Sequence, residues 1–438
     1  MSKVTFRQKK AGDVTEFLKS AKAAERYVHS FLKEEPDGIC SDEVKGTARH
    51  NLYVGTAGIL HMYVQFDQIL PDEDYRRLIE EQTRFLKGHI LDGVRLAKTD
   101  GEFVPGMAEA FYSGIGGIGL ILNEVYRLYQ NPDAKAGEEE ILAYYKKHQK
   151  KEAEGIFWSG NAPVFFDGGI ILFLIDSIQT YGDPDGKIRR MVIEATDDIL
   201  AHGMYHKDGG LEIDRLCVDF KHKEPNFEFG TAGIGYFFLK VYELTKDERY
   251  LQAAKAATVY LKSIAVSQKK GYLIPYKLGK YEDLFYLGNC HGPVGTAKLF
   301  YELYQVTGED TYMQEVFQLV DGAESLGAPF VQSAGFWNTT CVCCGPAGYV
   351  PLYEGLYYST GEEKWKKLCH EVGEVLLGTQ TGGYWEIAFD RTRPDELTRP
   401  AGYFTGAAGV AATLLQIYSM ETGTGKRIRL IDDPYLRS

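Results

Sequence analysis

One short signature occurs seven times along this chain of 438 residues and constrains its fold more than any other feature. Each copy consists of an apolar or aromatic pair, then Gly-x-x-Gly or a close variant, then a run of apolar residues, as in residues 227–234. Successive copies are 52 to 64 residues apart, a period that is typical of repeat architectures. The final glycines of the copies are Gly58, Gly117, Gly169, Gly233, Gly295, Gly348 and Gly409.

Each period follows the same helical plan. The residues after the glycines are apolar on nearly all sides, as in residues 233–244, so the helix that they form must be buried on most of its surface. A polar turn follows, and then an amphipathic pattern such as residues 249–261, which has one polar face for water. Several periods end in a short aromatic extended piece, such as residues 271–276. Alternating buried and amphipathic helices predict two concentric helical layers.

The first predicted helix, about residues 14–33, lacks the glycine signature. The last buried helix, residues 410–420, has almost no chain after it to provide an outer partner. An open solenoid would need polar capping repeats, whereas packing the first helix against the last closes a ring without them. We therefore predict one all-α domain over residues 1–438, an α/α toroid with seven double-helix repeats at about residues 50–420. The glycine turns would gather at one mouth of the ring, where loops commonly carry binding and chemistry.

The composition excludes several classes of protein. The formal net charge of −12 argues against a nucleic-acid partner, because phosphate binding needs a basic surface. No apolar run approaches the roughly 18 residues that a membrane-spanning helix needs. The first ten residues lack the apolar stretch of a signal peptide. Seven cysteines, an odd number with three of them crowded, argue against a disulfide framework and for a reducing compartment, so we expect a cytoplasmic protein.

Four of the seven cysteines lie in or beside two of the glycine turns. Cys290 precedes the glycines of the fifth copy, and Cys341, Cys343 and Cys344 precede those of the sixth. Thiolates at loop ends on a rigid scaffold, with one coordination position left for a substrate, are typical of an open zinc site. Two other interpretations stay open: free thiols packed beside glycines, or a structural four-cysteine site completed by Cys341. Because Cys341 and Cys343 are two residues apart in an extended segment, their side chains would point to opposite sides.

These motifs resemble those of the lanthionine synthetase C-like family, which contains zinc-dependent cyclases of lantibiotic pathways and free-standing relatives. The resemblance covers nearly the whole chain and is sharpest at residues 290–292 and 343–345. It implies an α/α toroid with one zinc ion per chain, bound by Cys290, Cys343 and Cys344, with cysteine where histidine is more common. In the family, the zinc activates a cysteine thiol that adds to a dehydroalanine or dehydrobutyrine to give a thioether. Three thiolate ligands would keep a bound substrate sulfur nucleophilic.

Several positions depart from the pattern that the resemblance implies. Phe229 stands where the family cyclases commonly carry a proton-handling histidine, and Tyr286 stands where an arginine is usual. Asn289 replaces a frequent tryptophan, and residues 161–166 lack the acid that often precedes the third pair of glycines. His291 does match a tyrosine-or-histidine position near the substrate. The resemblance thus implies a retained metal site with altered groups for proton transfer.

His291 is the remaining catalytic candidate, since an imidazole titrates near neutral pH and this one adjoins a predicted zinc ligand. A histidine that only begins the following helix explains the position equally well. Glu228, beside Phe229, is a second candidate, although neighbouring side chains usually point in different directions. Asp167 in the third turn is expected to cap its helix. The other cysteines, Cys40, Cys217 and Cys369, are interpreted as ordinary thiols.

Three functions are compatible with these residues. The first is zinc-dependent addition of a thiol to dehydroamino acids in a peptide, with a peptide or small thiol as substrate and a dehydratase as the expected partner. The alternative is a catalytically divergent zinc-containing protein of the same fold that binds peptides or small thiols. A carbohydrate-active enzyme on the same scaffold needs paired carboxylates or histidines, and the seven turns supply only Asp167 and Glu228. The sequence does not decide between the first two functions, because the thiolate-rich metal site favours one and Phe229 favours the other.

Overall fold

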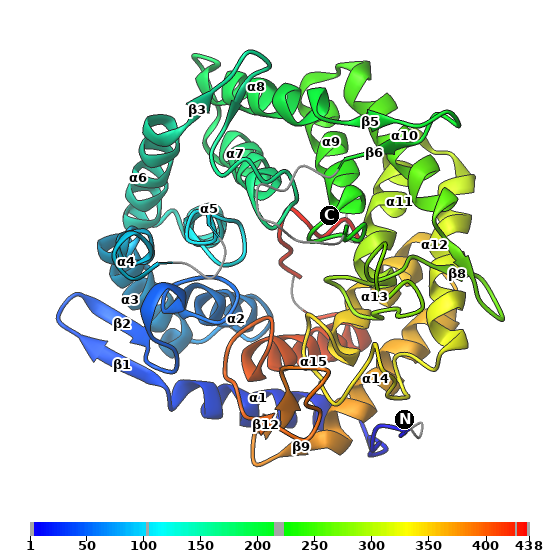
Figure 1. The fold of residues 1–438 in the computed structure, drawn as a ribbon. Coiled ribbons are helices and arrows are strands. Elements are labelled where there is room, and N and C mark those ends of the chain that lie inside the picture. Colours follow the sequence, from blue (N-terminus) through cyan, green and yellow to red (C-terminus); the bar gives the residue numbers. More distant parts are fainter. Residues whose placement is uncertain (1–3, 102–104, 214–222, 425–426, 436–438) are drawn as a thin grey trace.

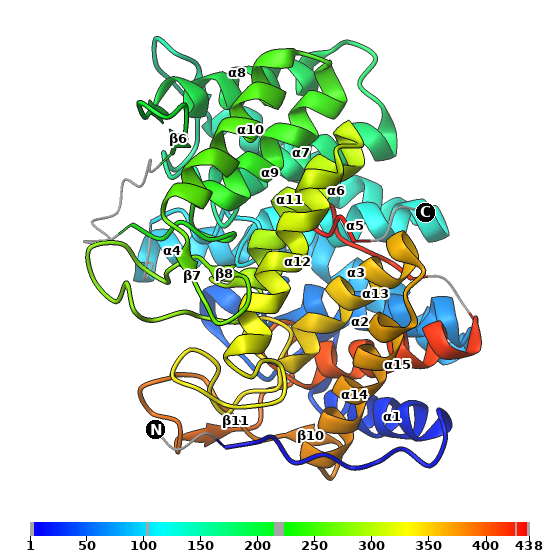
Figure 2. The same cartoon turned by 90° about the vertical axis from the view of Figure 1, so that its right-hand side faces the viewer.

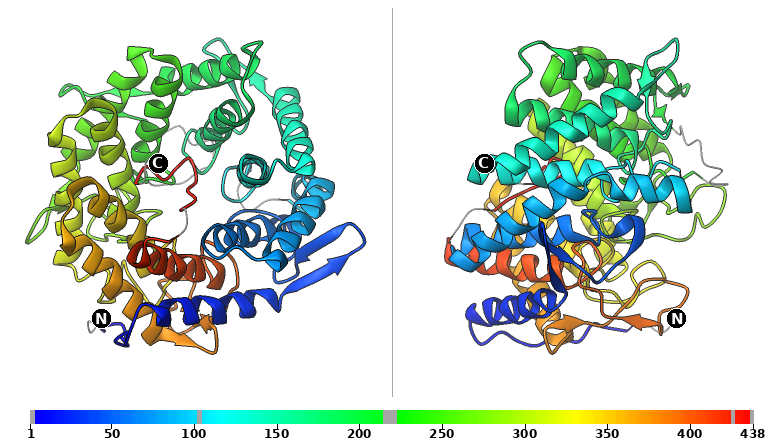
Figure 3. Two further views of the ribbon diagram at one scale, coloured as in Figure 1. Left: turned by 180° about the vertical axis from the view of Figure 1, so that it is seen from behind. Right: turned by 90° about the vertical axis from the view of Figure 1, so that its left-hand side faces the viewer.

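The computed structural model describes residues 4–101, 105–213, 223–424 and 427–435, and its helices form a ring of two layers (Figure 1). Seven helices line the axis of the ring, and a second layer surrounds them (Figure 3). The predicted α/α toroid of seven helix pairs is confirmed. The inner helices are α2 (Thr56–Ile69), α5 (Ile115–Tyr129), α7 (Asp167–Tyr181), α9 (Thr231–Thr245), α11 (Pro293–Thr307), α13 (Tyr349–Thr360) and α15 (Ala407–Thr422). The outer helices are α3 (Glu73–His89), α6 (Pro132–His148), α8 (Lys187–Ala201), α10 (Glu248–Ser263), α12 (Asp310–Ser325), α14 (Glu363–Thr379) and α1 (Thr15–His29).

Short antiparallel hairpins connect outer helices to the next inner helix. The longest is β1 (Leu32–Glu35) with β2 (Gly38–Ser41), in which Leu32 pairs with Ser41. The aromatic extended pieces expected at the ends of the periods form strands β8 (Tyr272–Leu273) and β10 (Tyr384–Trp385). The remaining strands are β3 (Lys150–Lys151), β4 (Ile156–Phe157), β5 (Met204–Tyr205), β6 (Leu211–Glu212), β7 (Val266–Ser267), β9 (Gln380–Thr381), β11 (Ile387–Ala388) and β12 (Leu397–Thr398). The short helices are η1 (Gly46–Ala48), α4 (Asp92–Asp100) and η2 (Pro346–Gly348).

The inner and outer helices begin in different ways. Three outer helices, α3, α6 and α10, start at polar side-chain caps: Asp72, Asn131 and Asp247 each accept a hydrogen bond from a backbone N–H of the first turn. Inner helices such as α9 start at a glycine without a side-chain cap. Their first N–H groups instead bond to carbonyls of the preceding turn, as Ala232 N–H does to Pro225. Backbone alone therefore satisfies these helix ends, which leaves the side chains of the turns free.

The last glycine of each signature allows close packing of the turn. A Cβ atom on Gly233 would lie 2.0 Å from the carbonyl oxygen of Phe227 and 2.8 Å from Cγ2 of Val164 in the neighbouring repeat. A Cβ atom on Gly295 would lie 2.0 Å from the carbonyl oxygen of Asn289 and 2.7 Å from Cβ of Phe227. Only glycine lets the turn fold onto its own helix while the next repeat packs against it.

Backbone hydrogen bonds join the turns that precede the inner helices into a belt. Bonds are made between six of the seven neighbouring pairs of turns, and one of them joins the last repeat to the first. This arrangement places all the glycine turns at one end of the ring, which we call the turn end. The bonds run from Tyr53 N–H to Tyr112 O, Phe165 N–H to Glu228 O, Glu228 N–H to Cys290 O, Asn289 N–H to Cys343 O, Cys343 N–H to Phe404 O and Phe404 N–H to Tyr53 O.

Helix α1 is the outer partner of the last inner helix, α15. The two helices pack side by side (Figure 1). Phe17 of α1 and Ile417 of α15 both lie against Gly373 of α14, where a Cβ atom would meet each of them within 4 Å. The apolar face of α1, which includes Ala21 and Val28, is fully buried. The seam between the ends of the repeat array is thus covered by the first helix.

Residues 427–435 enter the centre of the ring from the end opposite the turns, and we call them the C-terminal segment (Figures 1 and 2). Asp432 of this segment is buried, 3.0 Å from Nζ of Lys298, and accepts a hydrogen bond of 2.8 Å from the hydroxyl of Tyr112. The hydroxyl of Tyr435 donates to the carbonyl of Val294 at 2.6 Å. Within the described ranges, every helix is too short or too polar to cross a bilayer.

Candidate metal centre

Two neighbouring turns bring the cysteines together at the turn end. The first turn ends at Cys290 before α11, and the second contains Cys343 and Cys344 before η2 and α13. The N–H of Asn289 donates to the carbonyl of Cys343 at 2.8 Å, which fixes the turns against each other. Gly288 makes this contact possible, because a Cβ atom there would lie 2.7 Å from Cα of Cys344.

The three predicted zinc ligands converge. The Sγ atoms of Cys290 and Cys344 are 3.4 Å apart, and so are those of Cys344 and Cys343. All three sulfur atoms lie within 4.8 Å of one another. Cys290 and Cys343 are buried, whereas Cys344 is partly exposed, so the cluster opens to its surroundings beside Cys344. The spacing and the donor atoms fit a three-thiolate metal site.

Cys341 lies next to this cluster but outside it. Its sulfur accepts hydrogen bonds from the hydroxyl of Thr339 at 3.2 Å and from the N–H of Cys344 at 3.5 Å. It is not part of the group of mutually close sulfur atoms. The geometry therefore favours three ligands over the four-cysteine alternative. Cys40 and Cys369 are buried thiols elsewhere, and Cys217 lies outside the described residues.

The protonation of the three thiols is interdependent. Hydrogen bonds from Cys343 and Cys344 lower the pKa of Cys290 to about 7. The hydrogen bond to Cys290 raises the pKa of Cys343, and hydrogen bonds to Cys290, Cys341 and Cys343 raise that of Cys344 well above its usual range. One thiol thus ionises at the expense of the others, because adjacent buried thiolates repel each other. A divalent cation would remove this repulsion, so the donor set fits zinc.

A tyrosine from the first turn, two turns along the belt from the sixth, reaches the cluster. The hydroxyl of Tyr53, in the first turn, donates a hydrogen bond of 3.0 Å to the sulfur of Cys343. Its ring stacks on Phe404 with the centroids 5.3 Å apart. Burial raises the pKa of Tyr53 well above its usual range, so the phenol stays a donor. The sequence pattern counted Tyr53 only as an aromatic residue of the repeat, so its role was missed.

His291 lies within an aromatic wall beside the cysteines, formed by Phe165, Phe229, Tyr276 and Tyr286. The rings of Phe165 and Phe229 stack at 4.7 Å, and that of Phe229 stacks on His291 at 5.0 Å. Tyr276 and Tyr286 stack on each other at 3.9 Å and contact the imidazole edge-on. The wall fixes the plane of His291 and keeps water from its faces.

A carboxylate faces one nitrogen of His291. Oε2 of Glu224 lies 3.2 Å from Nδ1 of His291, and Glu224 is also paired with Lys277. Burial lowers the pKa of His291, and Glu224 opposes this shift only in part. The imidazole is therefore neutral at pH 7, able to take a proton and then return it.

The sequence matches the family model described as "Lanthionine synthetase C-like protein" over residues 46–424. The chain belongs to the lanthionine synthetase C-like family. Among solved structures, nisin cyclase gives a TM-score of 0.61 at 13% sequence identity, with 94% of each chain covered. The Lin0763 protein from Listeria innocua gives a TM-score of 0.51 at 11% identity, covering 94% of this chain and 99% of its own. At such identities the likeness shows the fold alone, and no curated protein sequence matches this chain.

The departures from the family pattern now have a structural context. Phe229 belongs to the aromatic wall, so its position holds His291 in place instead of carrying a proton. Tyr286, where an arginine is usual, also belongs to the wall, but Cζ of Arg391 lies 6.0 Å from its ring. Arg391 comes from the loop between β11 and β12 and is 5.5 Å from the ring of Tyr281. The guanidinium of Arg391 therefore places a positive charge near the mouth, and it comes from a segment that the sequence motifs did not indicate.

The two acidic residues weighed from the sequence are both buried. Glu228 is 1% exposed, and burial, followed by the charge of nearby Cys343, raises the pKa of its carboxyl well above the usual range. Asp167 does not cap α7: its carboxylate accepts the N–H groups of the preceding loop, from residues 158–160, at 2.9 to 3.1 Å.

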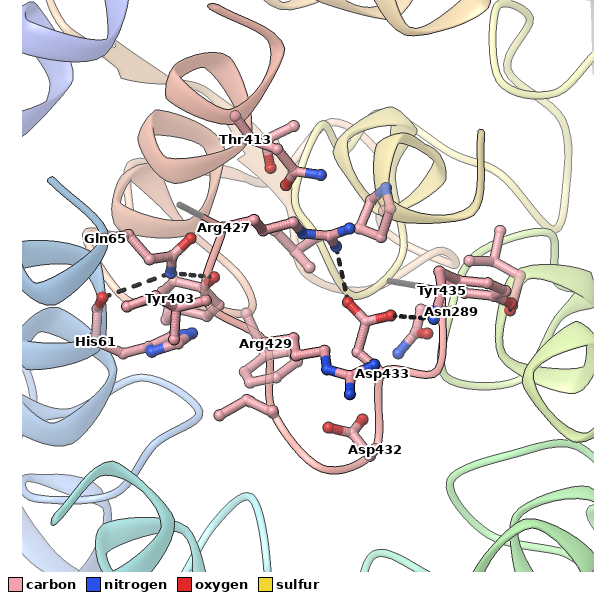
Figure 4. A pocket seen from close by; sticks show the side chains of 18 of the residues that line it. His61, Gln65, Asn289, Tyr403, Thr413, Arg427, Arg429, Asp432, Asp433 and Tyr435 are labelled. Atoms are coloured by element: carbon pink, nitrogen blue, oxygen red, sulfur yellow. Dashed lines mark hydrogen bonds and ion pairs between the residues drawn. The ribbon is translucent and has the colours of Figure 1, made fainter. Parts of the chain in front are cut away.

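The inner side of the metal turns meets the C-terminal segment. A pocket there is lined by Asn289 and Val342 from the two cysteine turns and by Leu430 and Asp432 from the segment (Figure 4). Arg427 holds the segment through Asp433 at 2.7 Å and Glu354 at 3.2 Å. The C-terminal segment thus packs against the inner side of the cysteine turns, and the sulfur atoms lie at the turn end of the ring.

Proposed function

We propose that the protein is a zinc-dependent enzyme that adds a thiol to a dehydroalanine or dehydrobutyrine residue of a peptide. In this reaction the sulfur forms a bond to Cβ, the Cα=Cβ double bond becomes single, and the thiol proton ends on Cα. The observation that carries the proposal is the convergence of three cysteine sulfurs within 4.8 Å at the turn end, with Cys344 partly exposed. When bound by Cys290, Cys343 and Cys344, zinc would stabilise a substrate thiolate at neutral pH.

The side chains around the cluster provide for the rest of the reaction. His291 is neutral and stacked, with Nδ1 facing Glu224, so Nε2 is the atom that accepts the thiol proton and delivers it to Cα. The aromatic wall excludes water from this transfer. Tyr53 donates to the sulfur of Cys343 and thereby moderates the charge of the thiolate group.

The chemistry also defines the partners. The substrate is a peptide or a small thiol together with a dehydrated peptide, and a dehydratase is the expected source of the dehydroamino acid. The three cysteine thiols must stay reduced to bind zinc, and a cytoplasmic location would provide the reducing conditions. Nisin cyclase has the same fold, which supports a peptide as the substrate class.

The first experiment measures zinc in the purified chain and in Cys290→Ala. Wild type should contain one zinc ion at the cysteine cluster, and the variant should lose it together with thiol addition to a dehydroalanine peptide. Cys369→Ala, which removes a buried thiol elsewhere, is the matched control and should retain both. Full retention of this zinc by Cys290→Ala would refute the ligand assignment.

His291→Asn tests the proton transfer separately. We expect it to reduce the rate of addition by about 100-fold without removing zinc, in line with the usual contribution of a general acid or base. An unchanged rate would leave His291 with a packing role only.

A second candidate function is a zinc-containing protein that binds thiols or peptides without turnover. Phe229 favours it, because this residue occupies the place of a proton-handling histidine. Mass spectrometry of a dehydroalanine peptide incubated with the wild-type protein and a thiol separates the two. Thiol binding with no thioether product would select the binding protein.

A further inference from the structure

A second cluster of metal-ligating side chains lies on the outside of the ring, away from the cysteines. His50 follows η1, His89 is the last residue of α3, and Asp92 is the first residue of α4. One ligand atom from each lies within 4.8 Å of the others. Among the described residues, only this group and the cysteine group bring three such side chains so close together.

Both nitrogens of His89 are already oriented. Nδ1 lies 2.6 Å from Oδ2 of Asp92, and Nε2 lies 2.8 Å from Oδ2 of Asp37 in the β1–β2 turn. The other oxygen of Asp92 accepts a hydrogen bond of 2.9 Å from Arg95. A histidine that ligates a metal commonly donates its second N–H to a carboxylate, and a ligating carboxylate is itself held by a donor. Asp37 and Arg95 occupy those two supporting positions.

His50 supplies the observation that a metal-free arrangement does not explain. Its side chain is 6% exposed, and its Nδ1 has no hydrogen-bond partner among the described residues. Burial, followed by the charges of Arg49 and His89, lowers the pKa of His50 to about 4, so the ring is neutral. Buried polar atoms are rarely left without a partner, and a neutral imidazole is the form that binds metals.

We propose that His50, His89 and Asp92 bind one divalent transition-metal ion of the zinc type, with Asp37 as the carboxylate that orients His89. The metal takes the place of the proton between Nδ1 of His89 and Asp92. Two imidazoles and one carboxylate suit zinc and its neighbours better than calcium or magnesium, which prefer oxygen ligands only. Ligands about 2.0 to 2.2 Å from one ion lie closer together than 4.8 Å, so the side chains close slightly on binding.

The position of the site indicates a structural role. His50 belongs to the turn that leads into α2 and contains Tyr53, whereas His89 and Asp92 belong to the outer layer. A metal here would tie the first turn of the belt to α3 and α4, beside the seam where the last repeat meets the first. The site shares no residue with the cysteine cluster, so it stands independently of the proposed function.

The test counts metal in the full chain. Protein saturated with Zn²⁺ and freed of excess should hold two zinc ions per chain, and His50→Ala should hold one. His202→Ala, which removes an exposed histidine just after the end of α8, is the matched control and should hold two. His50→Gln, which keeps more of the side-chain volume, should also hold one if His50→Ala folds poorly. Asp37→Asn should weaken the second site by about 10- to 100-fold.

Cobalt distinguishes the two sites. Co²⁺ bound by thiolates absorbs strongly in the near ultraviolet, and His50→Ala should keep this band while losing one equivalent of bound cobalt. Equal metal content in wild type, His50→Ala and His50→Gln would overturn the proposal and leave His89 as an imidazolium paired with Asp37 and Asp92. Failure of the cysteine site would appear differently: wild type would hold one ion, His50→Ala none, and the near-ultraviolet band would be missing.

Discussion

The turn end and the centre of the ring are held together in different ways. At the turn end, neighbouring repeats are joined by backbone hydrogen bonds, and glycines allow the turns to approach closely. In the centre of the ring, side chains do this work: Lys298 pairs with Asp432, and Arg427 pairs with Glu354 and Asp433 across the C-terminal segment. Where the backbone holds the scaffold, side chains are free for chemistry, so thiols and an imidazole can gather there. Where ion pairs hold the scaffold, the charged side chains are already paired with one another.

Removing α1 should have the largest effect, because it opens the seam where the last repeat meets the first. Deletion of residues up to Lys33 removes α1 and so uncovers α15, the helix against which α1 packs. We expect the truncated protein to aggregate if residues 1–438 form one cooperative domain. Solubility and thermal melting test this, and a soluble truncation with the melting curve of the full chain would contradict it.

Breaking the central ion pairs alone should lower stability and leave the metal in place. In Lys298→Met the buried carboxylate of Asp432 loses its cation, which we expect to cost about 3–5 kcal/mol in the free energy of unfolding. Urea denaturation measures this loss, with Lys262→Met on the surface of α10 as control. The double variant Lys298→Met/Asp432→Asn should recover much of the stability. Loss of zinc in the single variant at a temperature where it is folded would show that the turn end depends on the central ion pairs.

A buried carboxyl near the opposite end predicts an effect of pH. Burial raises the pKa of Glu138 in α6 to about 7, against an ordinary value of about 4.5 in the unfolded chain. Between these values the folded state keeps a proton that the unfolded state has lost, so this residue's contribution to stability falls as the pH rises from 4.5 through 7.

Glu138→Gln removes that dependence. The variant should be more stable than wild type by about 1–3 kcal/mol at pH 8 and nearly equal to it at pH 4.5. Urea denaturation at both pH values checks this, and the exposed Glu140→Gln should show no such difference. A difference that is the same at both pH values would contradict the assignment.

The smallest expected effect concerns a single hydrogen bond at the turn end. Tyr53→Phe removes the donor to the sulfur of Cys343 but keeps the ring stacked on Phe404. We expect zinc affinity to fall by about tenfold or less, with a loss of about 1 kcal/mol in stability. Competition with a zinc chelator measures the affinity. Complete loss of zinc would mean that Tyr53 positions the whole turn.

The sequence could predict the ring and the convergence of the thiols for a physical reason. Each repeat carries its own period of burial, and Cys290 and Cys343 precede adjacent inner helices, so local patterns determine where they lie. The C-terminal segment follows no repeat, and its position depends on pairs such as Lys298 with Asp432, 134 residues apart. Arg391, in the loop between β11 and β12, also contacts Tyr281 and Tyr286, which are far from it in the sequence. Such contacts depend on tertiary packing, which single-sequence patterns do not contain.

The packing of α1 against α15 has a consequence for how the protein is made. Helix α1, which closes the ring, is synthesised long before its partner α15. Until then the apolar face of α1, with Phe17, Ala21, Ala24 and Val28, has nothing to cover it. Contacts between distant parts of a sequence form slowly, and exposed apolar surface promotes aggregation meanwhile. The nascent chain therefore exposes this apolar face until α15 has been made, and its dependence on chaperones should be greatest in that interval.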